Sequence, residues 1–562
     1  MVSVNKWVLL ALVFWASQAF GDTYWVSPSG SADWNACKSV NDPGSNYCSL
    51  ATANSSATAG DVVLLKGGSY TGFTNLINPQ NSGTLSDRIT FKNAPGETPT
   101  LSPSTILTAI TVQQKKYITI DGINAYNVGR FFFIGYGAEH IEISNGVFDR
   151  SVNSYVSGAI TDSNTGYTAN IPTKNIWIHH NTFSRYGREN VTSNCQVGGQ
   201  IRIVGSSTDT ASYNTIENNV FFQGGHDCID VAGKYNVVKN NIFHNEEVFF
   251  IDPGGCGNSP ASGFFGQRNI LLTDYGEGTN DHNLIEGNRV GHAGTPPDKD
   301  SAHGIETGGR YTVVRYNYIF GNGAAGFHIK QQKTSYGNYA RVFNNTFYKN
   351  GYGDEAIADT SRAGLTYICK DGRPYDVIVK NNIVFDNYRT HRVAGSSCVG
   401  EITYLNNFER DPKFLDTNMK DRTSRVLPDL RFSAGSEAID KGRHLTTAKQ
   451  AGVNSRTLVV YDALYFQDGS WGSGLAKGVT HFADWIAIGK VSDTAEISYI
   501  DYSTNTITLR SPLTWEKDAP IYLFRKSDGA QTLYGSAPDV GAYEYPYPGG
   551  ISVPTIQSIR RH

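Results

Sequence analysis

A short polar segment built around one Asn recurs eight times through the middle of the sequence. In each copy, Val, Ile or Phe follows the Asn within three residues, and a strand-like alternation precedes it, as in Tyr235 to Val238. The eight positions are Asn145, Asn181, Asn219, Asn241, Asn288, Asn317, Asn345 and Asn382. A repeat of this size predicts stacked structural units rather than a single globular core.

The spacing of the repeat identifies the unit. Successive Asn residues lie about 22 to about 47 positions apart, and the shortest spacing is the length of one bare coil of a parallel β-solenoid. The alternation has period two and is rich in Val, Ile, Phe and Tyr, which favours strands over helices. We expect the Asn side chains to stack at a turn, where they satisfy polar groups buried between coils.

The Asn repeat, the coil length and a secretion signal resemble the right-handed parallel β-helix superfamily of pectate lyases, chondroitinase-B-like and alginate lyases, polygalacturonase-like hydrolases and uronan epimerases. The resemblance covers roughly residues 60 to 430. It implies an all-β, right-handed parallel β-helix, and an enzyme that acts on an acidic polysaccharide.

The two ends of the sequence predict further parts. Residues 22–70 resemble the N-terminal cap and first coil of such proteins, and residues 71–442 form the β-helix. Residues 443–535 carry alternating strands typical of a small inserted β domain, which we expect to cap the C-terminal end of the solenoid. Segments 436–442 and 538–545 resemble a closing pair of strands, so residues 536–562 are interpreted as closing strand and tail.

Residues 1–21 indicate a secretory signal peptide, with Lys6, an apolar run from Trp7 to Trp15, and a small-residue cleavage site at Gly21. We therefore expect a secreted protein that carries disulfide bonds. No later stretch approaches the roughly 20 apolar residues of a membrane helix, so no membrane association is expected.

Seven Cys residues fit this compartment. Short loops favour the pairs Cys37 with Cys48 and Cys369 with Cys398, whereas Cys195, Cys228 and Cys256 compete for a third bridge. The formal charge of −3 gives no argument for nucleic acid as a partner. We expect a monomer whose partner is an acidic polysaccharide.

Charged residues lie at equivalent positions of five coils. Aligning the coils on one inward Ile each, namely Ile201, Ile229, Ile251, Ile305 and Ile329, points the next residue of every strand outward. The resulting outward row is Arg202, Asp230, Asp252, Glu306 and Lys330. Like charges on neighbouring strands destabilise a sheet, so three consecutive carboxylates predict a bound cation, unless the face is merely solvated.

The carboxylates of Asp230, Asp252 and Glu306 suit Ca²⁺, a hard ion that prefers oxygen ligands. A cation beside a uronate carboxylate acidifies the proton on the adjacent carbon, which a base can then remove in β-elimination. Lys330 is the first candidate for the base, with salt bridging to Glu306 as its alternative role.

Other residues are predicted to support catalysis or binding near this row. His303 and His328 lie within two residues of the aligned Ile positions and are candidates for an acid or base near neutral pH, although a surface hydrogen-bonding role is the alternative. Arg268 and Arg310, placed on adjoining loops, are candidates to clamp sugar carboxylates, and His226 is a further candidate for substrate binding.

The rival hydrolase hypothesis rests on three fragments that resemble motifs of polygalacturonase-like enzymes. They are residues 225–229, 302–305 and 328–330, although His226 stands where those enzymes have an acid and His328 where they have Arg. Asp230 and Glu306, two coils apart, would suit an inverting pair. The sequence thus favours a lyase and leaves an inverting hydrolase, an epimerase and a non-catalytic glycan-binding solenoid as alternatives.

Overall fold

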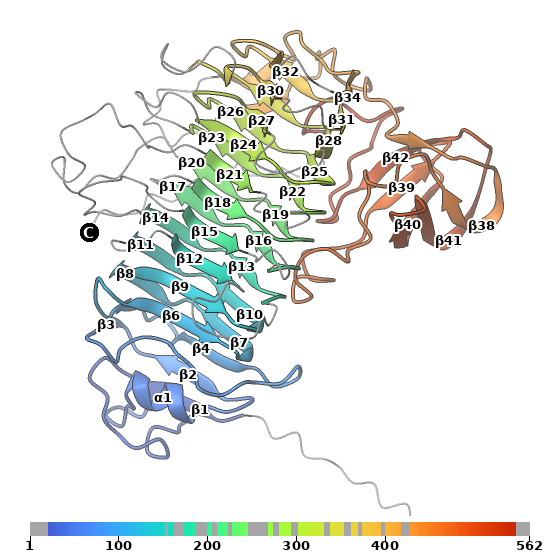
Figure 1. Ribbon diagram of the computed structural model, residues 1–562. Coiled ribbons are helices and arrows are strands. Elements are labelled where there is room, and N and C mark those ends of the chain that lie inside the picture. The colour runs from blue at the N-terminus through green and yellow to red at the C-terminus, as the bar shows by residue number, and fades with distance from the viewer. Residues whose placement is uncertain are drawn as a thin grey trace, which may run out of the picture.

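The computed structural model describes residues 21–151, 156–161, 173–186, 199–204, 211–222, 227–244, 268–273, 280–293, 302–330, 338–352, 361–368, 374–394, 399–417 and 427–546. These residues form a parallel β-helix of three long sheets, with a smaller β domain packed against its side (Figure 1). The predicted signal peptide, up to residue 20, lies outside the described residues. Among the described residues, no helix is long and apolar enough to cross a membrane.

The first sheet has 13 strands, all paired in parallel with the next coil. Its order is β1 (Thr23–Val26), β2 (Val62–Leu65), β4 (Ile89–Asn93), β7 (Lys116–Asp121), β10 (Glu139–Ser144), β13 (Trp177–His179), β16 (Thr215–Glu217), β19 (Val237–Lys239), β22 (Leu284–Glu286), β25 (Thr312–Arg315), β28 (Asn338–Phe343), β31 (Pro374–Lys380) and β34 (Val399–Leu405).

The second sheet has 11 strands in the order β3 (Gly68–Thr71), β5 (Pro99–Ser102), β8 (Asn124–Val128), β11 (Val147–Ser151), β14 (Thr182–Tyr186), β17 (Val220–Phe222), β20 (Ile242–His244), β23 (Arg289–Gly291), β26 (Tyr318–Phe320), β29 (Thr346–Tyr348) and β32 (Ile383–Phe385). The third has 10 strands, β6 (Thr108–Gln113), β9 (Arg130–Gly135), β12 (Val156–Thr161), β15 (Gly199–Val204), β18 (Asp227–Val231), β21 (Arg268–Leu272), β24 (His303–Thr307), β27 (Phe327–Lys330), β30 (Leu365–Ile368) and β33 (His391–Ala394). Most coils thus supply one strand to each of the three sheets, and the predicted parallel β-helix is confirmed.

Identical residue types stack between coils inside the helix. Phe148, Phe183, Phe221 and Phe243 form one column of stacked rings, with centroids 4.9–5.0 Å apart. Ile side chains from successive strands of the third sheet form another column and are fully buried. This stacking gives the solenoid a continuous apolar core that no single coil could bury alone.

The predicted Asn ladder is present at the turn between the first and second sheets. The backbone N–H of each ladder Asn donates to the side-chain oxygen of the Asn on the next coil at 2.8–3.0 Å. The members are Asn181, Asn219, Asn241, Asn288, Asn317, Asn345, Asn382 and Asn407.

The prediction for Asn145 is wrong by one residue. Gly146 occupies the ladder register, since its N–H donates to Asn181 Oδ1 at 2.9 Å. Asn145 precedes it with a φ of 57°, a left-handed conformation that Asn tolerates better than most residues. Asn thus occurs in these turns for two reasons, the ladder hydrogen bond and the left-handed backbone conformation. The sequence pattern alone does not show which reason applies at a given Asn.

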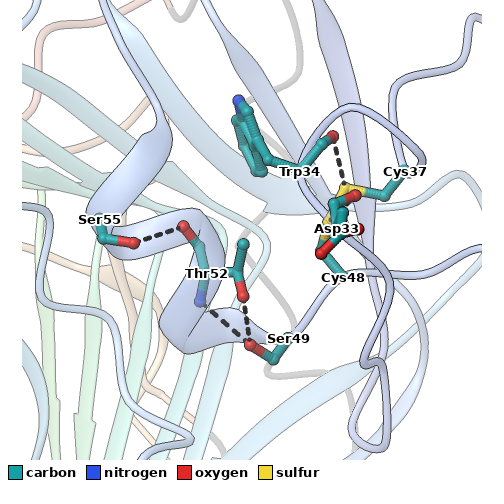
Figure 2. Close-up of a disulfide and its surroundings, with 7 residues drawn as sticks. All are labelled: Asp33, Trp34, Cys37, Cys48, Ser49, Thr52 and Ser55. Carbon is teal, nitrogen blue, oxygen red and sulfur yellow. Dashed lines mark hydrogen bonds between the residues drawn. A yellow bond between two sulfur atoms is a disulfide. The ribbon is translucent and has the colours of Figure 1, made fainter.

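The N-terminal end carries the short helix α1 (Leu50–Ser56), which lies beside the first coil (Figure 1). Ser49 caps it by accepting a hydrogen bond from the Thr52 N–H at 3.0 Å. The predicted Cys37–Cys48 disulfide is present next to this cap (Figure 2). Of the other Cys residues, only Cys228 is described; it is buried, and Cys195, Cys256, Cys369 and Cys398 lie outside the described residues.

Residues 443–535, here the C-terminal β domain, contain a six-stranded sheet in the order β37 (Thr446–Thr447), β42 (Pro520–Arg525), β39 (Trp485–Ile488), β40 (Thr494–Asp501), β41 (Thr506–Trp515) and β38 (Gly452–Val459). Its strands pair antiparallel. Contrary to the expected end cap, the domain packs on the outer face of the first sheet, where Val237, Leu284 and Val313 join its apolar core (Figure 1).

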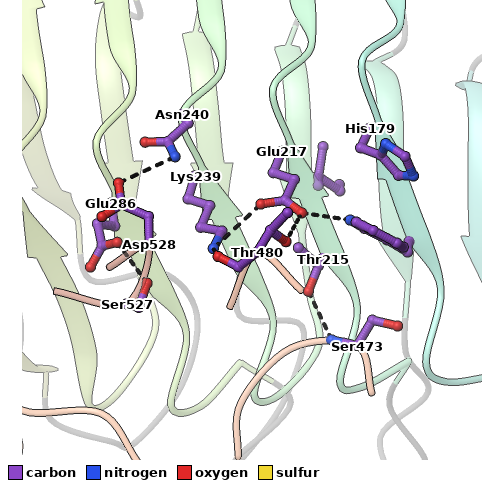
Figure 3. Close-up of polar contacts among 12 residues, drawn as sticks. His179, Thr215, Glu217, Lys239, Asn240, Glu286, Ser473, Thr480, Ser527 and Asp528 are labelled. Carbon is purple, nitrogen blue, oxygen red and sulfur yellow. Dashed lines mark hydrogen bonds and ion pairs between the residues drawn. The ribbon is translucent and has the colours of Figure 1, made fainter. Parts of the chain in front are cut away.

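Polar contacts complete this interface. Glu217, Lys239 and Glu286 point from neighbouring strands of the first sheet toward the C-terminal β domain (Figure 3). Thr480 donates to Glu217, and Ser527 donates to Glu286 at 2.6 Å. The domain therefore contacts charged as well as apolar positions of one sheet face.

The segments 436–442 and 538–545 lie side by side, but neither forms the predicted closing strand. Val540 N–H donates to Ala438 at 3.1 Å, and Gly442 N–H donates to Pro538 at 2.7 Å, both at backbone oxygens. The antiparallel pair near this end is instead β35 (Phe414–Asp416) with β36 (Asp429–Phe432). Segment 436–442 contains a turn at 437–440, and segment 538–545 contains bends but no strand.

Candidate active site

The outer face of the third sheet carries a row of charged residues on neighbouring strands. Arg202 on β15 stands opposite Asp230 on β18, and Leu271 on β21 lies between Asp230 and Glu306 on β24. His328 on β27 stands opposite Glu306. This row, from Arg202 to His328, is called the third-sheet row below.

The predicted middle member of the row is replaced. Ile270, and not Ile251, lies between Ile229 and Ile305 in the buried column, so Leu271 takes the place expected for Asp252. The coil between Asn241 and Asn288 is long, and its strand of the third sheet begins only at Arg268. Asp252 itself lies outside the described residues.

The register prediction for Lys330 is wrong by two residues. Phe327 aligns with Ile305, so His328 stands opposite Glu306, while Lys330 lies two positions further along β27 and opposite Ile368. The error arises because Phe327 and Ile329 both occupy buried positions, and the sequence alone does not show which one pairs with Ile305.

Arg268 connects two carboxylates at the centre of the site. It lies on strand β21 rather than on a loop, with Nε 2.8 Å from Glu306 Oε2 and Nη1 3.1 Å from Asp227 Oδ1. Asp227, Arg268 and His303 occupy equivalent positions at the starts of β18, β21 and β24. The two neighbouring acids raise the pKa of the buried Arg268, so the guanidinium stays charged.

Two histidines complete this cluster. The rings of His303 and His328 stack with centroids 4.2 Å apart, and both side chains are almost fully buried. The Ala325 N–H donates to His303 Nδ1 at 3.1 Å, which places the proton of neutral His303 on Nε2, 3.9 Å from Glu306. His328 Nδ1 lies 2.5 Å from Thr366 Oγ1.

These contacts give the two rings different capacities. His303 Nε2 carries a hydrogen, so this ring can donate a hydrogen bond to a ligand oxygen. When His328 Nδ1 donates to Thr366, its Nε2 holds the lone pair of a base. The arrangement thus pairs a donor with an acceptor beside one carboxylate and one guanidinium.

The other end of the row is more open. Arg202 Nε lies 2.9 Å from Asp230 Oδ2, and Asp230 Oδ1 accepts a hydrogen bond from Thr273 at 2.8 Å. The Arg202 side chain is 26% exposed, whereas that of Asp230 is 6% exposed. An anionic ligand therefore meets Arg202 before the buried groups of the row.

One predicted binding residue, Arg310, is not part of this cluster. Arg310 lies at the bend that leads into β25, where it pairs with Asp281 at 3.1 Å and its guanidinium packs over Tyr311. His226 lies outside the described residues. The structure thus brings together Arg202, Asp230, Arg268, His303, Glu306 and His328 from the predicted set.

The described carboxylates do not fit one Ca²⁺ between them. Asp230 and Glu306 lie on strands that are separated by β21, about 9.6 Å apart from strand spacing, and each already contacts an Arg. The group compatible with a metal in the described residues is His303, Glu306 and His328, whose ligand atoms lie within 4.8 Å of one another. Its two nitrogen donors suit a transition metal better than calcium, and the hydrogen bond at His303 opposes ligation through Nε2.

The sequence analysis missed the roles of Asp227 and Thr366 as partners of Arg268 and His328. A usable signal was present: Asp227, Arg268 and His303 each precede a small or polar residue and then Ile. Aligning on that pattern would have selected Ile270. Thr366 carries no comparable signal, because Thr is common on exposed strands.

The three long sheets of parallel strands define the class of this protein, a parallel β-helix protein. No family model matches the chain, and no curated protein matches its sequence. Among solved structures, a pectate lyase is 16% identical, with 76% of this chain and 94% of that chain covered and a TM-score of 0.39. A PL6 family polysaccharide lyase from Pseudopedobacter saltans is 15% identical, with 70% and 96% covered and a TM-score of 0.40.

A mannuronan C-5 epimerase A-module from Azotobacter vinelandii is 13% identical, with 63% of this chain and 91% of that chain covered and a TM-score of 0.37. At these identities and TM-scores the likeness assigns no activity to this chain.

Proposed function

We propose that the protein cleaves an acidic, uronate-containing polysaccharide by β-elimination on the outer face of the third sheet. The observation that supports this most is the convergence of Arg268, His303, Glu306 and His328 on three consecutive strands. A cation, a proton donor and a proton acceptor are the groups that elimination beside a carboxylate needs.

The roles follow from the contacts. Arg268 faces the uronate carboxylate and stabilises the negative charge that develops when the adjacent carbon loses its proton. His328 removes that proton, with Thr366 orienting the ring. The electron pair forms a carbon–carbon double bond and the glycosidic bond breaks. The His328 imidazolium returns the proton to the leaving oxygen, to which the His303 Nε2–H donates a hydrogen bond.

Two further residues extend the site. Arg202, at the exposed end, binds the carboxylate of a neighbouring sugar with two hydrogen bonds. Lys330, two residues beyond His328 on the same strand, remains the alternative base. No step in this scheme passes through calcium.

Inverting hydrolysis is the second candidate. Asp230 and Glu306 lie on strands that are about 9.6 Å apart, close to the roughly 6.5–9.5 Å between the carboxyl groups of inverting glycosidases. Their contacts with Arg202 and Arg268 favour ionised carboxylates, which suits a general base better than a general acid.

Activity assays with alginate, pectate and a glycosaminoglycan as substrates test the proposal. A lyase creates an unsaturated uronate that absorbs ultraviolet light, whereas a hydrolase releases reducing ends without that absorbance. We expect the first result, and a loss of about 100-fold or more for His328→Gln and Glu306→Gln. Lys330→Ala is expected to lose activity only if it, and not His328, is the base.

His391→Gln is the matched control, since His391 is exposed on β33 of the same sheet and outside the cluster. We expect it to retain full activity. EGTA is expected to leave the rate unchanged, because Arg268 supplies the positive charge. Full activity in both His328→Gln and Glu306→Gln would refute the site, and inactivation by EGTA would instead favour calcium.

A further inference from the structure

A cleft of about 810 Å³ lies on a different side of the molecule, between the solenoid and the C-terminal β domain. Its floor includes Arg289 on β23 and Tyr318 on β26, which stand opposite each other in the second sheet. Arg525 and Tyr534 line it from the C-terminal β domain, and Tyr543 from the segment that follows. The volume lies within the range of small-molecule sites, roughly 300–1,000 Å³.

Arg289 is the most informative residue in the cleft. Its Nη2 donates to the Tyr543 hydroxyl at 3.2 Å, and its guanidinium lies 5.7 Å from the centre of the Tyr318 ring. Its Nη1 is buried and has no hydrogen-bond partner among the residues that the structure describes. A buried guanidinium N–H without an acceptor is costly, so this atom favours an acceptor supplied by a ligand.

The nearby acids do not neutralise Arg289. Asp429, whose pKa is lowered partly by Arg289, accepts hydrogen bonds from Arg431 at both carboxylate oxygens. Asp528 pairs with Lys526. Burial and the neighbouring Asp539 raise the pKa of Glu544, and its two carboxylate oxygens accept hydrogen bonds from the backbone N–H groups of Tyr534 and Asp539.

Arg525 adds a second cation at the rim. Its side chain is exposed and forms no ion pair within the described part of the chain, and its guanidinium lies 5.5 Å from the centre of the Trp485 ring. Tyr534, 38% exposed, lines the same cleft together with the amide side chains of Asn240 and Gln531. Aromatic rings can pack on sugar faces, and amides can bond to hydroxyl groups.

From these groups we infer that the cleft is a second saccharide site, which binds a carboxylated sugar through Arg289 and Arg525 and packs its ring on tyrosine. Arg binds a carboxylate with two parallel hydrogen bonds, which explains why the cleft has two guanidinium groups rather than hydroxyls alone. The site is separate from the third-sheet row, so one chain can hold an acidic polymer at two places.

Titration calorimetry with trigalacturonate and trimannuronate tests this inference. The full chain with His328→Gln serves as the background, so that the sugars stay intact. We expect Arg289→Gln and Arg525→Gln each to weaken the cleft binding at least 10-fold. Trisaccharides with carboxyl groups reduced to alcohols should bind at least 10-fold more weakly to the unaltered cleft.

Arg510→Gln is the matched control, because Arg510 is 61% exposed on the same domain and outside the cleft. It should bind as the background does. Arg525 is at the surface, and equal melting temperatures would show that its variant is folded. Unchanged affinity in both cleft variants, or equal binding of the reduced sugars, would overturn the inference.

The two sites can fail independently. If the protein has no lyase activity but loses trisaccharide binding with Arg525→Gln, the proposed function is wrong and the cleft stands. If Arg202→Gln alone abolishes binding of the trisaccharides, the sugar binds at the third-sheet row, and the cleft binds no sugar.

Discussion

Two rows of charged residues run across the coils of this protein, one on the first sheet and one on the third. On the first sheet, Glu217, Lys239, Glu286 and Arg315 stand opposite one another on consecutive strands. On the third sheet, the row runs from Arg202 through Asp230 and Glu306 to His328. The first-sheet row includes Arg315 and the third-sheet row adjoins Arg268, and each of these Arg residues contacts two carboxylates. The surroundings of the two rows differ.

The first-sheet row is sealed by the C-terminal β domain. Arg315 bonds to Glu286 at 2.6 Å and to both oxygens of Asp484, a residue of that domain. All three side chains are fully buried. Charges there find partners in a distant part of the chain, so their evident role is to fix how the domain docks.

The third-sheet row has no such partner domain in the described residues. Arg268 takes both its acids, Asp227 and Glu306, from adjacent strands of its own sheet. Its contacts hold no second domain in place, and the row includes two stacked histidines that the first-sheet row lacks. Burial of charge is therefore common to both rows. The stacked pair of His303 and His328, together with the partly exposed Arg202, is what distinguishes the candidate active site.

Removing Arg315 gives the largest effect that this comparison predicts. Arg315→Met leaves Glu286 and Asp484 buried without their cation, so the free energy of unfolding should fall by about 3–5 kcal/mol. Urea denaturation measures this loss. Activity of the folded protein should remain, and its disappearance at full folding would show that the two rows are coupled.

Removing Arg268 is the equivalent change on the third sheet. Arg268→Met should lower activity at least 100-fold and cost about 3 kcal/mol of stability, the lower end of the range for a broken buried pair, because Asp227 is 5% exposed whereas the partners of Arg315 are fully buried. Denaturation and a lyase assay on the same preparation separate the two effects. A loss of stability as large as that of Arg315→Met, with activity preserved, would mean that both rows are structural.

The pH dependence of stability should also differ between the rows. Burial raises the pKa of Asp484 to about 6, despite the opposing effect of Arg315. A raised pKa in the folded state contributes stability that is complete below about pH 4 and is lost as the pH rises through 6. We expect this loss to reach roughly 2–3 kcal/mol between pH 4 and 7.

Asp484→Asn tests that expectation, since an amide does not titrate. The free energy of unfolding of the unaltered protein should fall with rising pH relative to that of Asp484→Asn. Parallel profiles over this range would show that Asp484 titrates as an ordinary Asp.

The sequence predicted the fold far better than it predicted the site. The Asn ladder and the inward apolar residues repeat on most coils, so an error at one copy, such as Asn145, leaves the architecture unchanged. A charged row has no such redundancy. Taking Ile251 instead of Ile270 as the inward residue placed the wrong segment in the strand of that coil. Taking Ile329 instead of Phe327 shifted the predicted position of Lys330 by two residues.

The docking of the C-terminal β domain was also beyond the sequence. Glu217, Lys239 and Glu286 are ordinary outward residues by pattern, and only their contacts with Thr480 and Ser527 show that this face is covered. Periodicity shows which residues face outward, but whether solvent or another domain meets them depends on packing between distant segments.

The smallest effect is expected at the exposed end of the third-sheet row. Arg202 is 26% exposed and pairs with Asp230, so Arg202→Gln should change the free energy of unfolding by less than about 1 kcal/mol. If Arg202 binds the carboxylate of a neighbouring sugar, its loss should raise KM severalfold on a polymer and leave kcat nearly unchanged, because the reacting sugar lies nearer to Arg268 and His328. Kinetics at several salt concentrations measure this, since screening weakens an exposed charge. A fall in kcat with unchanged KM would place Arg202 at the reacting sugar. The neighbouring sugars of the polymer would then bind nearer to His328 than to Arg202.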